Sequence, residues 1–466
     1  MIKKVFILTT LFLVVLLAFF VRKKNYAEIP IPGQSTDEYS YSWVGLSLLK
    51  TGMPVAVSGF PGYKNLEKRY LNVDHYMQVI PSDPFEINYP WMDHPPLLGL
   101  ITGGYAYANG ARVFGDISSL VIRKPIIVIG SLSVALAIIF SYINFGYVAA
   151  LFTGLIYATA PLVVLSSRMI QAENAIIPCI LACLISISLY LKNKGDKWLF
   201  ISALIAGGAT LFKLTGIVCY LIIIFSLFIK YKKINKLFWK DLSFFLAISL
   251  PISFLFVIYG LVYGWENFQT ILFSNYNRFY GIGVNSILEL VRNQRLTQHK
   301  FLPEIWVISG WFVFFASLIK TQKNIGDKLI KLAIIAYLIV YIFFGSQPYG
   351  WYTFPFWPLL IIGLGRFLSL GLTKSKNLFA VILMLLIVVG ANIDRLINVF
   401  EFQKYSQFWR FGVSGIIFLF VLSELLKIKR TYIIKLLVLI IFAGAILLNI
   451  KYLGQINIDF WWGNIS

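Results

Sequence analysis

The stretch VFILTTLFLVVLLAFFV (residues 5–21) carries no charged side chain, and as a helix it is long enough to cross a hydrocarbon layer of about 30 Å. Similar runs recur along the 466 residues, of which 59% are hydrophobic and 13% are charged, and the mean hydropathy is +0.78. These values lie far outside the range of soluble globular proteins. Because backbone polar groups in hydrocarbon must be satisfied internally, we predict an all-α polytopic membrane protein.

We predict about thirteen transmembrane helices. A further apolar stretch, residues 96–114, is rich in glycine, alanine and tyrosine, so we expect an interfacial or re-entrant helix there instead of a span. Two segments, 22–121 and 264–303, are long enough to build structure between spans. The predicted spans are residues 5–21, 122–142, 146–165, 173–191, 197–212, 214–230, 241–263, 304–320, 328–346, 354–371, 377–393, 410–426 and 431–449.

The positive-inside rule favours a cytoplasmic N-terminus. With that orientation, the segments on the inner face hold about half of the 41 Lys and Arg residues. They hold few of the 20 Asp and Glu residues, so most carboxylates and all three histidines fall on the outer face. We therefore expect a multi-pass plasma membrane protein whose active site faces outward, with the first span kept as an uncleaved anchor.

The net charge of +21 is typical of nucleic-acid binding, but the inner loops account for much of it. Basic loops of this kind contact anionic membrane lipids, so we expect lipid partners and no nucleic acid. Cys179, Cys183 and Cys219 all lie in predicted spans, where they serve as small apolar residues. The cysteines therefore predict neither a disulfide nor a metal site.

The stretch TDEYSYSWVGLSLLKTG (residues 36–52) is predicted to form an interfacial helix that ends at Gly52. Ser35 and Glu38 have the spacing of a capping box, which favours a structural role for Glu38 at the helix start. Asp37 lies in the first turn, where complementing the helix dipole and serving in catalysis are equally good explanations. The apolar positions at helical spacing are Tyr39, Trp43, Leu46 and Leu49.

The stretch WMDHPPLLGL (residues 91–100) ends the polar part of the first long loop and begins the glycine-rich helix. Asp93 has the position of an N-cap for a helix that starts at the two prolines. His94, beside the free N–H groups of that helix, is a candidate anion contact. A second Asp-His pair, Asp74 with His75, suggests a metal site only weakly, because nothing fixes the pairs relative to each other.

Three ionisable residues lie at predicted membrane boundaries: Arg168, Glu173 and Lys213. Such residues are costly in a membrane and are often functional. The structural alternatives are an ion pair between Arg168 and Glu173, or snorkelling of the long basic side chains to the surface.

The order of these motifs resembles the GT-C superfamily of polyprenyl-phosphate-sugar glycosyltransferases. The motifs are DE at an interfacial helix, HPPL, SR…E, FKLTG and YGWYTFPFWPLL, and the likeness covers most of residues 30–370. Within the superfamily, the chain is most similar to the protein O-mannosyltransferases and the lipid A aminoarabinose transferases. The resemblance implies transfer of a sugar from a polyprenyl-phosphate donor to a hydroxyl acceptor at the outer face, with inversion.

The resemblance also implies roles for individual residues. Asp37 would be the catalytic base, and His94 would contact the donor phosphate. Arg168 would contact the phosphate or order the site, and Lys213 would support the phosphate. Glu173 would orient the acceptor or, together with Asp37, hold a divalent metal cation, which makes such a cation a possible cofactor.

Secondary candidates follow from the same likeness. Arg278 and His299 would belong to a loop that roofs the site, and Tyr352 would line a sugar or prenyl pocket. Glu38 and Asp93 complete the set of candidates. We expect residues 1–393 to form the catalytic region and residues 394–466 to add C-terminal helices. The sugar stays open, and so does the acceptor, which could be a lipid, a glycan or a protein.

The main alternative is a lipid-linked sugar flippase or a secondary transporter. Transporters tend to carry repeats and ionisable residues near the bilayer midplane. Here the ionisable residues gather at one boundary, which favours an enzyme.

Overall fold

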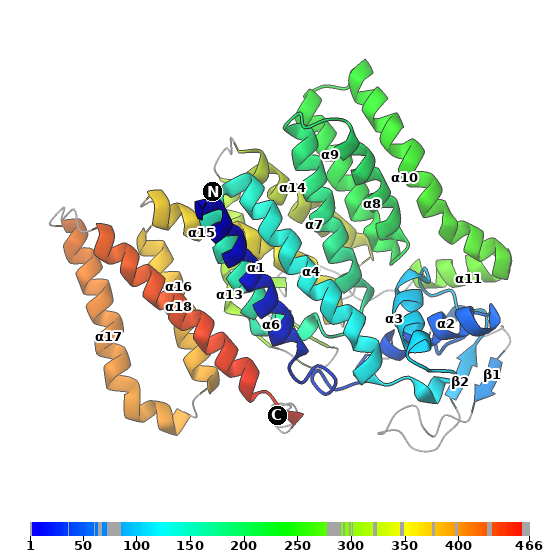
Figure 1. Ribbon diagram of the computed structural model, residues 1–466, viewed down its shortest axis with the longest axis horizontal. Coiled ribbons are helices and arrows are strands. Elements are labelled where there is room, and N and C mark those ends of the chain that lie inside the picture. Colours follow the sequence, from blue (N-terminus) through cyan, green and yellow to red (C-terminus); the bar gives the residue numbers. More distant parts are fainter. Residues whose placement is uncertain are drawn as a thin grey trace.

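The computed structural model is a bundle of helices whose long members run roughly side by side (Figure 1). It describes residues 2–35, 37–59, 61–63, 68–71, 85–276, 290–291, 294–297, 300, 302–319, 324–344, 349–374, 378–396, 399–425 and 431–458. Apolar runs become helices here because a helix satisfies its own backbone hydrogen bonds. The predicted all-α membrane architecture is confirmed.

Each of the thirteen predicted spans coincides with helix in the structure. Within the described residues, seven helical segments are long and apolar enough to cross a membrane, and shorter apolar helices accompany them. The bundle helices are α1 (Ile2–Lys23), α4 (Ser119–Phe145), α5 (Tyr147–Thr159), α6 (Pro161–Ser166), α7 (Ala172–Leu191), α8 (Lys197–Thr210), α9 (Val218–Tyr231), α10 (Lys236–Tyr263), α13 (Ile305–Leu318), α14 (Ile325–Phe344), α15 (Phe356–Lys374), α16 (Leu378–Leu396), α17 (Val399–Leu425) and α18 (Thr431–Gln455).

The predicted span 146–165 is divided into two helices. Ala160 leaves the helical backbone at the end of α5, and Pro161 starts α6 as its first residue, where a missing N–H costs nothing. Glu304 joins this break to α13, because its carboxylate accepts from the Leu162 N–H at 3.1 Å. Glu304 therefore satisfies a free N–H at the start of α6.

The segment between α1 and α4 forms a cap over one end of the bundle (Figure 1). It contains α2 (Asp37–Thr51), the short helix η1 (Pro61–Tyr63), α3 (Leu97–Ala108) and η2 (Phe114–Asp116). The interfacial helices predicted at 36–52 and within 96–114 are both present. The cap also holds a two-stranded antiparallel sheet of β1 (Lys68–Leu71) and β2 (Phe85–Asn88), which the sequence analysis did not predict.

Helices α2 and α3 lie in very close contact because glycines face each other along the pair. A Cβ added at Gly103 would collide with the backbone oxygen of Ser42, and one at Gly99 would meet that of Tyr41. The Ser42 hydroxyl hydrogen-bonds the Thr102 hydroxyl across the same interface at 3.1 Å. Ala172 and Ala175 of α7 belong to the same apolar cluster as the buried residues of this pair.

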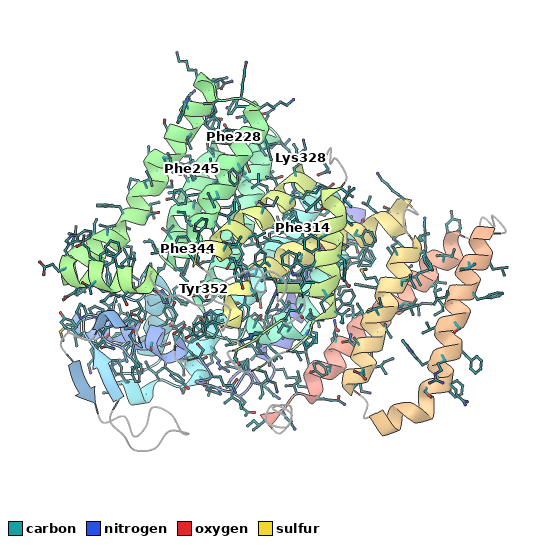
Figure 2. All side chains as sticks on the ribbon, turned by 180° about the vertical axis from the view of Figure 1, so that it is seen from behind. Phe228, Phe245, Phe314, Lys328, Phe344 and Tyr352 are labelled. Carbon is teal, nitrogen blue, oxygen red and sulfur yellow. The ribbon has the colours of Figure 1, made fainter. Side chains whose placement is uncertain are left out.

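Three shorter elements complete the cap end. These are η3 (Leu214–Ile217), α11 (Trp265–Tyr276) and η4 (Gly350–Thr353). Helix α11 lies in the segment 264–303, beside the end of α10 and near α3 (Figure 1). Figure 2 shows Tyr352 of η4 toward the cap end and Lys328 of α14 toward the opposite end. The turns that carry the candidate residues therefore gather at one end of the bundle.

Candidate active site

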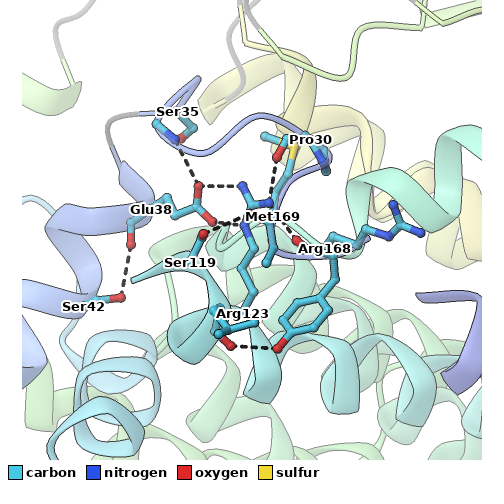
Figure 3. A network of polar contacts seen from close by, with 12 residues as sticks. Pro30, Ser35, Glu38, Ser42, Ser119, Arg123, Arg168 and Met169 are labelled. Carbon is cyan, nitrogen blue, oxygen red and sulfur yellow. Dashed lines mark hydrogen bonds and ion pairs between the residues drawn. The ribbon is translucent and has the colours of Figure 1, made fainter. Parts of the chain in front are cut away.

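A buried ion pair positions the start of α2. The Arg123 guanidinium on α4 donates from Nε to Glu38 Oε1 at 2.5 Å and from Nη2 to Glu38 Oε2 at 2.9 Å (Figure 3). Arg123 also donates to the backbone oxygens of Tyr26 and Pro30. Glu38 Oε2 also accepts from the Gly33 N–H at 3.4 Å, so the carboxylate does reach back to the segment before its own helix, as predicted, although at Gly33 and not at Ser35. Its main partner is Arg123, a charge-assisted bidentate partner 85 residues away.

Arg168 holds the same segment from the other side. Its three donating nitrogens reach the backbone oxygens of Val21, Arg22 and Ile29 at 2.9–3.1 Å, and its side chain is buried. An ion pair with Glu173 and snorkelling to the surface are both excluded by these contacts. Burial, with the charges of Arg22 and Arg123, lowers the pKa of Arg168 to about 9. The Arg168 guanidinium is therefore occupied by backbone oxygens, and its site-ordering role stays a prediction.

Glu173 and Lys213 form the second buried ion pair. Glu173 lies in the first turn of α7 and Lys213 in the turn between α8 and η3, with Lys213 Nζ 2.5 Å from Glu173 Oε1. The ammonium also lies 4.2 Å from the ring centroid of Tyr352. Burial acts to lower the pKa of Lys213, but Glu173, Tyr352 and Asp37 raise it above its usual value. Lys213 is therefore a fixed cation.

Tyr41 lies at the centre of the candidate residues, and the sequence analysis did not single it out. Its side chain is 1% exposed. Burial raises the pKa of its phenol well above the usual value, and the charges of Asp37, Glu173 and Asp93 raise it further. Asp37 and Tyr41 are four residues apart on α2 and so share one helix face. This spacing is the sequence feature from which Tyr41 could have been predicted as a site residue. The structure thus brings Asp37, Glu173 and Lys213 around one point.

His94 and Asp93 approach the same point from the turn before α3. The His94 ring stacks on Tyr41 with centroids 5.6 Å apart, and the Leu97 N–H donates to the Leu211 oxygen at 3.4 Å. The turn of His94 is thereby joined to the turn of Lys213. Asp93 is not the N-cap of α3, because that helix starts at Leu97 with Pro96 as its cap. The Asp93 carboxylate instead accepts from the Tyr63 hydroxyl at 2.6 Å.

Four predicted residues lie outside the described part of the chain: Asp74, His75, Arg278 and His299. The side-chain amide of Asn275 on α11, which is described, donates to the Asp93 backbone oxygen at 3.1 Å. Helix α11 therefore contacts the edge of the site. Arg123, which lies beside Lys124 at the start of the predicted span 122–142, was not among the predicted site residues, although charged residues in such positions are often functional.

The donors described here fit a divalent cation poorly. Glu173 Oε1 already faces the Lys213 ammonium at 2.5 Å, and a metal beside it would meet that positive charge. Among the described residues, no group of three or more His, Cys, Asp and Glu side chains has the arrangement of a metal site. The expected cation therefore stays a prediction, and no chemical step below depends on it.

An apolar cavity of about 830 Å³ lies between α13, α14, α15 and α16. Its polar residues include Asp327, Lys331 and Arg366, which belong to the inner half of these helices in the predicted topology. No candidate residue of the cap end lines it. The candidate site is therefore defined by the converging side chains and not by this cavity.

The fold can be compared with solved structures. It is similar to ArnT from Cupriavidus metallidurans, solved with undecaprenyl phosphate, with a TM-score of 0.55, 16% identity, and coverage of 96% of this chain and 77% of that chain. The fold is of the GT-C type. The GT-C likeness extends to the oligosaccharyltransferase AglB from Archaeoglobus fulgidus, solved with an inhibitory peptide and a dolichol-phosphate. There the TM-score is 0.51 at 11% identity, with 96% of this chain and 56% of that chain covered.

Sequence comparison gives a consistent result. Residues 93–258 match the family model described as dolichyl-phosphate-mannose-protein mannosyltransferase. No curated protein sequence matches the chain. The matched residues include His94, Arg168, Glu173 and Lys213, so the GT-C resemblance drawn from the sequence motifs is confirmed.

Proposed function

We propose that this GT-C protein is a membrane glycosyltransferase that moves a sugar from a polyprenyl-phosphate donor to a hydroxyl acceptor. The observation that carries the proposal is the convergence of Asp37, Glu173 and Lys213 at the cap end. The solved ArnT complex contains undecaprenyl phosphate, and the matching family model is described as acting with dolichyl-phosphate-mannose. Both descriptions support a lipid-linked sugar as the donor.

The proposed step is a single displacement at the anomeric carbon. The acceptor oxygen forms a bond to this carbon while the bond from the carbon to the phosphate oxygen breaks. The acceptor proton passes to the Asp37 carboxylate, and the polyprenyl phosphate leaves as an anion. Because the two bonds lie on opposite faces of the carbon, the product has inverted configuration. The enzyme needs a base for the acceptor and a cation for the leaving group.

Lys213 is the group best placed to stabilise the leaving phosphate. It is buried, it stays charged, and Glu173 and the Tyr352 ring fix its position. His94, which the helix-start contact joins to the Lys213 turn, is proposed as the second phosphate contact. Glu38, Arg123 and Arg168 act as positioning residues, because they hold the segment before α2 and so place Asp37.

The active site is proposed to face the outer side of a plasma membrane. The support comes from the charge distribution, in which the segments at the other end of the bundle are rich in Lys and Arg. Membrane lipids would surround the bundle. The acceptor class follows from neither the contacts nor the charges described here, and lipid, glycan and protein hydroxyls are all compatible with the step.

A transfer assay tests the proposal. Purified protein in liposomes is incubated with radiolabelled polyprenyl-phosphate sugars and a membrane extract, and the label is followed into lipid, glycan and protein fractions. The proposal expects label to leave one donor and enter one fraction. Absence of transfer from every donor, combined with movement of labelled lipid across the liposome bilayer, would contradict it and support a flippase.

A further inference from the structure

Two buried polar atoms at the site lack a hydrogen-bond partner within the described residues: the Tyr41 hydroxyl and Glu173 Oε2. Their residues are 1% and 0% exposed, respectively. An unsatisfied buried polar group costs free energy, and nearly all such groups in proteins find a partner. Two such atoms in a site that also holds a fixed cation indicate that a bound polar ligand supplies the missing hydrogen bonds.

The two atoms have complementary hydrogen-bonding chemistry. The Tyr41 hydroxyl can donate, and the Glu173 carboxylate oxygen can only accept. Glu173 is close enough to Tyr41 for its charge to act on the phenol. A ligand hydroxyl can accept from one group and donate to the other, whereas a phosphate oxygen can only accept. The pair therefore suits a polyol and not a second phosphate.

We infer that Tyr41 and Glu173 form a subsite for the hydroxyl groups of the donor sugar. Lys213 places this subsite relative to the donor, because its ammonium contacts Glu173 Oε1 while stabilising the phosphate in the proposed reaction. The sugar bonded to that phosphate then lies beside the other carboxylate oxygen. The inference rests on the proposed function and adds to it the residue Tyr41 and the recognition of the sugar hydroxyl groups.

The test compares sugar-bearing with sugar-free lipid ligands on two variants. Tyr41→Phe removes the hydroxyl but keeps the ring that stacks on His94. Its control is Tyr39→Phe, a buried tyrosine on the same helix whose phenol responds to Glu38 and Arg123. Binding of polyprenyl-phosphate sugars carrying mannose, glucose, galactose or arabinose, and of sugar-free polyprenyl phosphate, is measured for the full-length protein in nanodiscs.

The inference expects Tyr41→Phe to weaken binding of the preferred sugar-bearing lipid about 5- to 10-fold, the range of one neutral hydrogen bond. Binding of the sugar-free lipid should not change, and Tyr39→Phe should alter neither ligand. Equal loss for both ligands, no loss for either, or a wild type that gains no affinity from any of the four sugars would overturn the inference. Failure of sugar-free lipid to bind at all would instead contradict the proposed function.

Discussion

Lys213 and Glu173 show how a single contact can serve both stability and chemistry. Each side chain is buried, so each charge depends on the other. From the sequence, Lys213 could have been explained by snorkelling to the membrane surface. That explanation is wrong, because its ammonium points inward to Glu173 on α7. No local pattern could have revealed this, because the two residues are 40 positions apart.

Removing Lys213 alone should destabilise the protein. We expect Lys213→Met to lower the free energy of unfolding by about 3–5 kcal/mol, because it leaves the Glu173 carboxylate buried and unpaired. The double variant Lys213→Met with Glu173→Gln should recover most of this stability, yet it should not recover transfer. Thermal unfolding in detergent and the transfer assay measure the two effects. A double variant as unstable as the single one would contradict the pairing.

The α2–α3 pair is the element that delivers Asp37 to the site. The sequence predicted both helices and the end of α2 at Gly52, which has φ +71°. It did not predict the partners of Glu38 and Asp93, because Arg123 and Tyr63 come from elsewhere in the chain. Their spacing along the chain suggested helix caps, but in the folded chain each carboxylate hydrogen-bonds a side chain from another element. The two-stranded sheet was missed because its strands are only four residues long.

Two neighbouring glycines of α3 provide a matched pair of variants. Gly103→Ala should lower the free energy of unfolding by about 1–3 kcal/mol, since the added Cβ collides with the α2 backbone at Ser42 and Leu46. Transfer should fall as well, because α2 carries Asp37. In Gly104→Ala the added Cβ would contact only the end of the Leu49 side chain. This variant should leave the free energy of unfolding unchanged or raise it by up to about 1 kcal/mol. Similar unfolding curves for the two variants would contradict the close packing described.

At the scale of the whole molecule, composition alone was enough to predict the bundle. Thirteen apolar runs became helices because length and hydropathy fix a helix in a membrane. The convergence of the polar turns could not be predicted from the spans, since it depends on how α7, α8 and α15 pack. Motif order supplied that information through the GT-C resemblance. Residues 394–466 contribute α17 and α18, which lie far from the cap end elements α2 and α3 (Figure 1).

The proposed orientation can be tested with single cysteines in a variant that lacks the three native ones. Asn109→Cys lies exposed at the end of α3, and Lys233→Cys lies exposed between α9 and α10, toward the other end of the bundle. We expect a membrane-impermeant thiol reagent to label residue 109 in intact cells. Residue 233 should react after the inner face is opened. The reverse pattern would contradict an outward-facing site.

The most direct test of the central claim is single-turnover transfer by Asp37→Asn, measured together with donor binding. A missing general base should slow transfer about 100- to 10,000-fold while donor affinity stays within about 2-fold, because the amide keeps the shape of the carboxylate. The control Asp116→Asn, at an exposed carboxylate of the cap, should transfer at the wild-type rate. Near-normal turnover by Asp37→Asn would contradict the account.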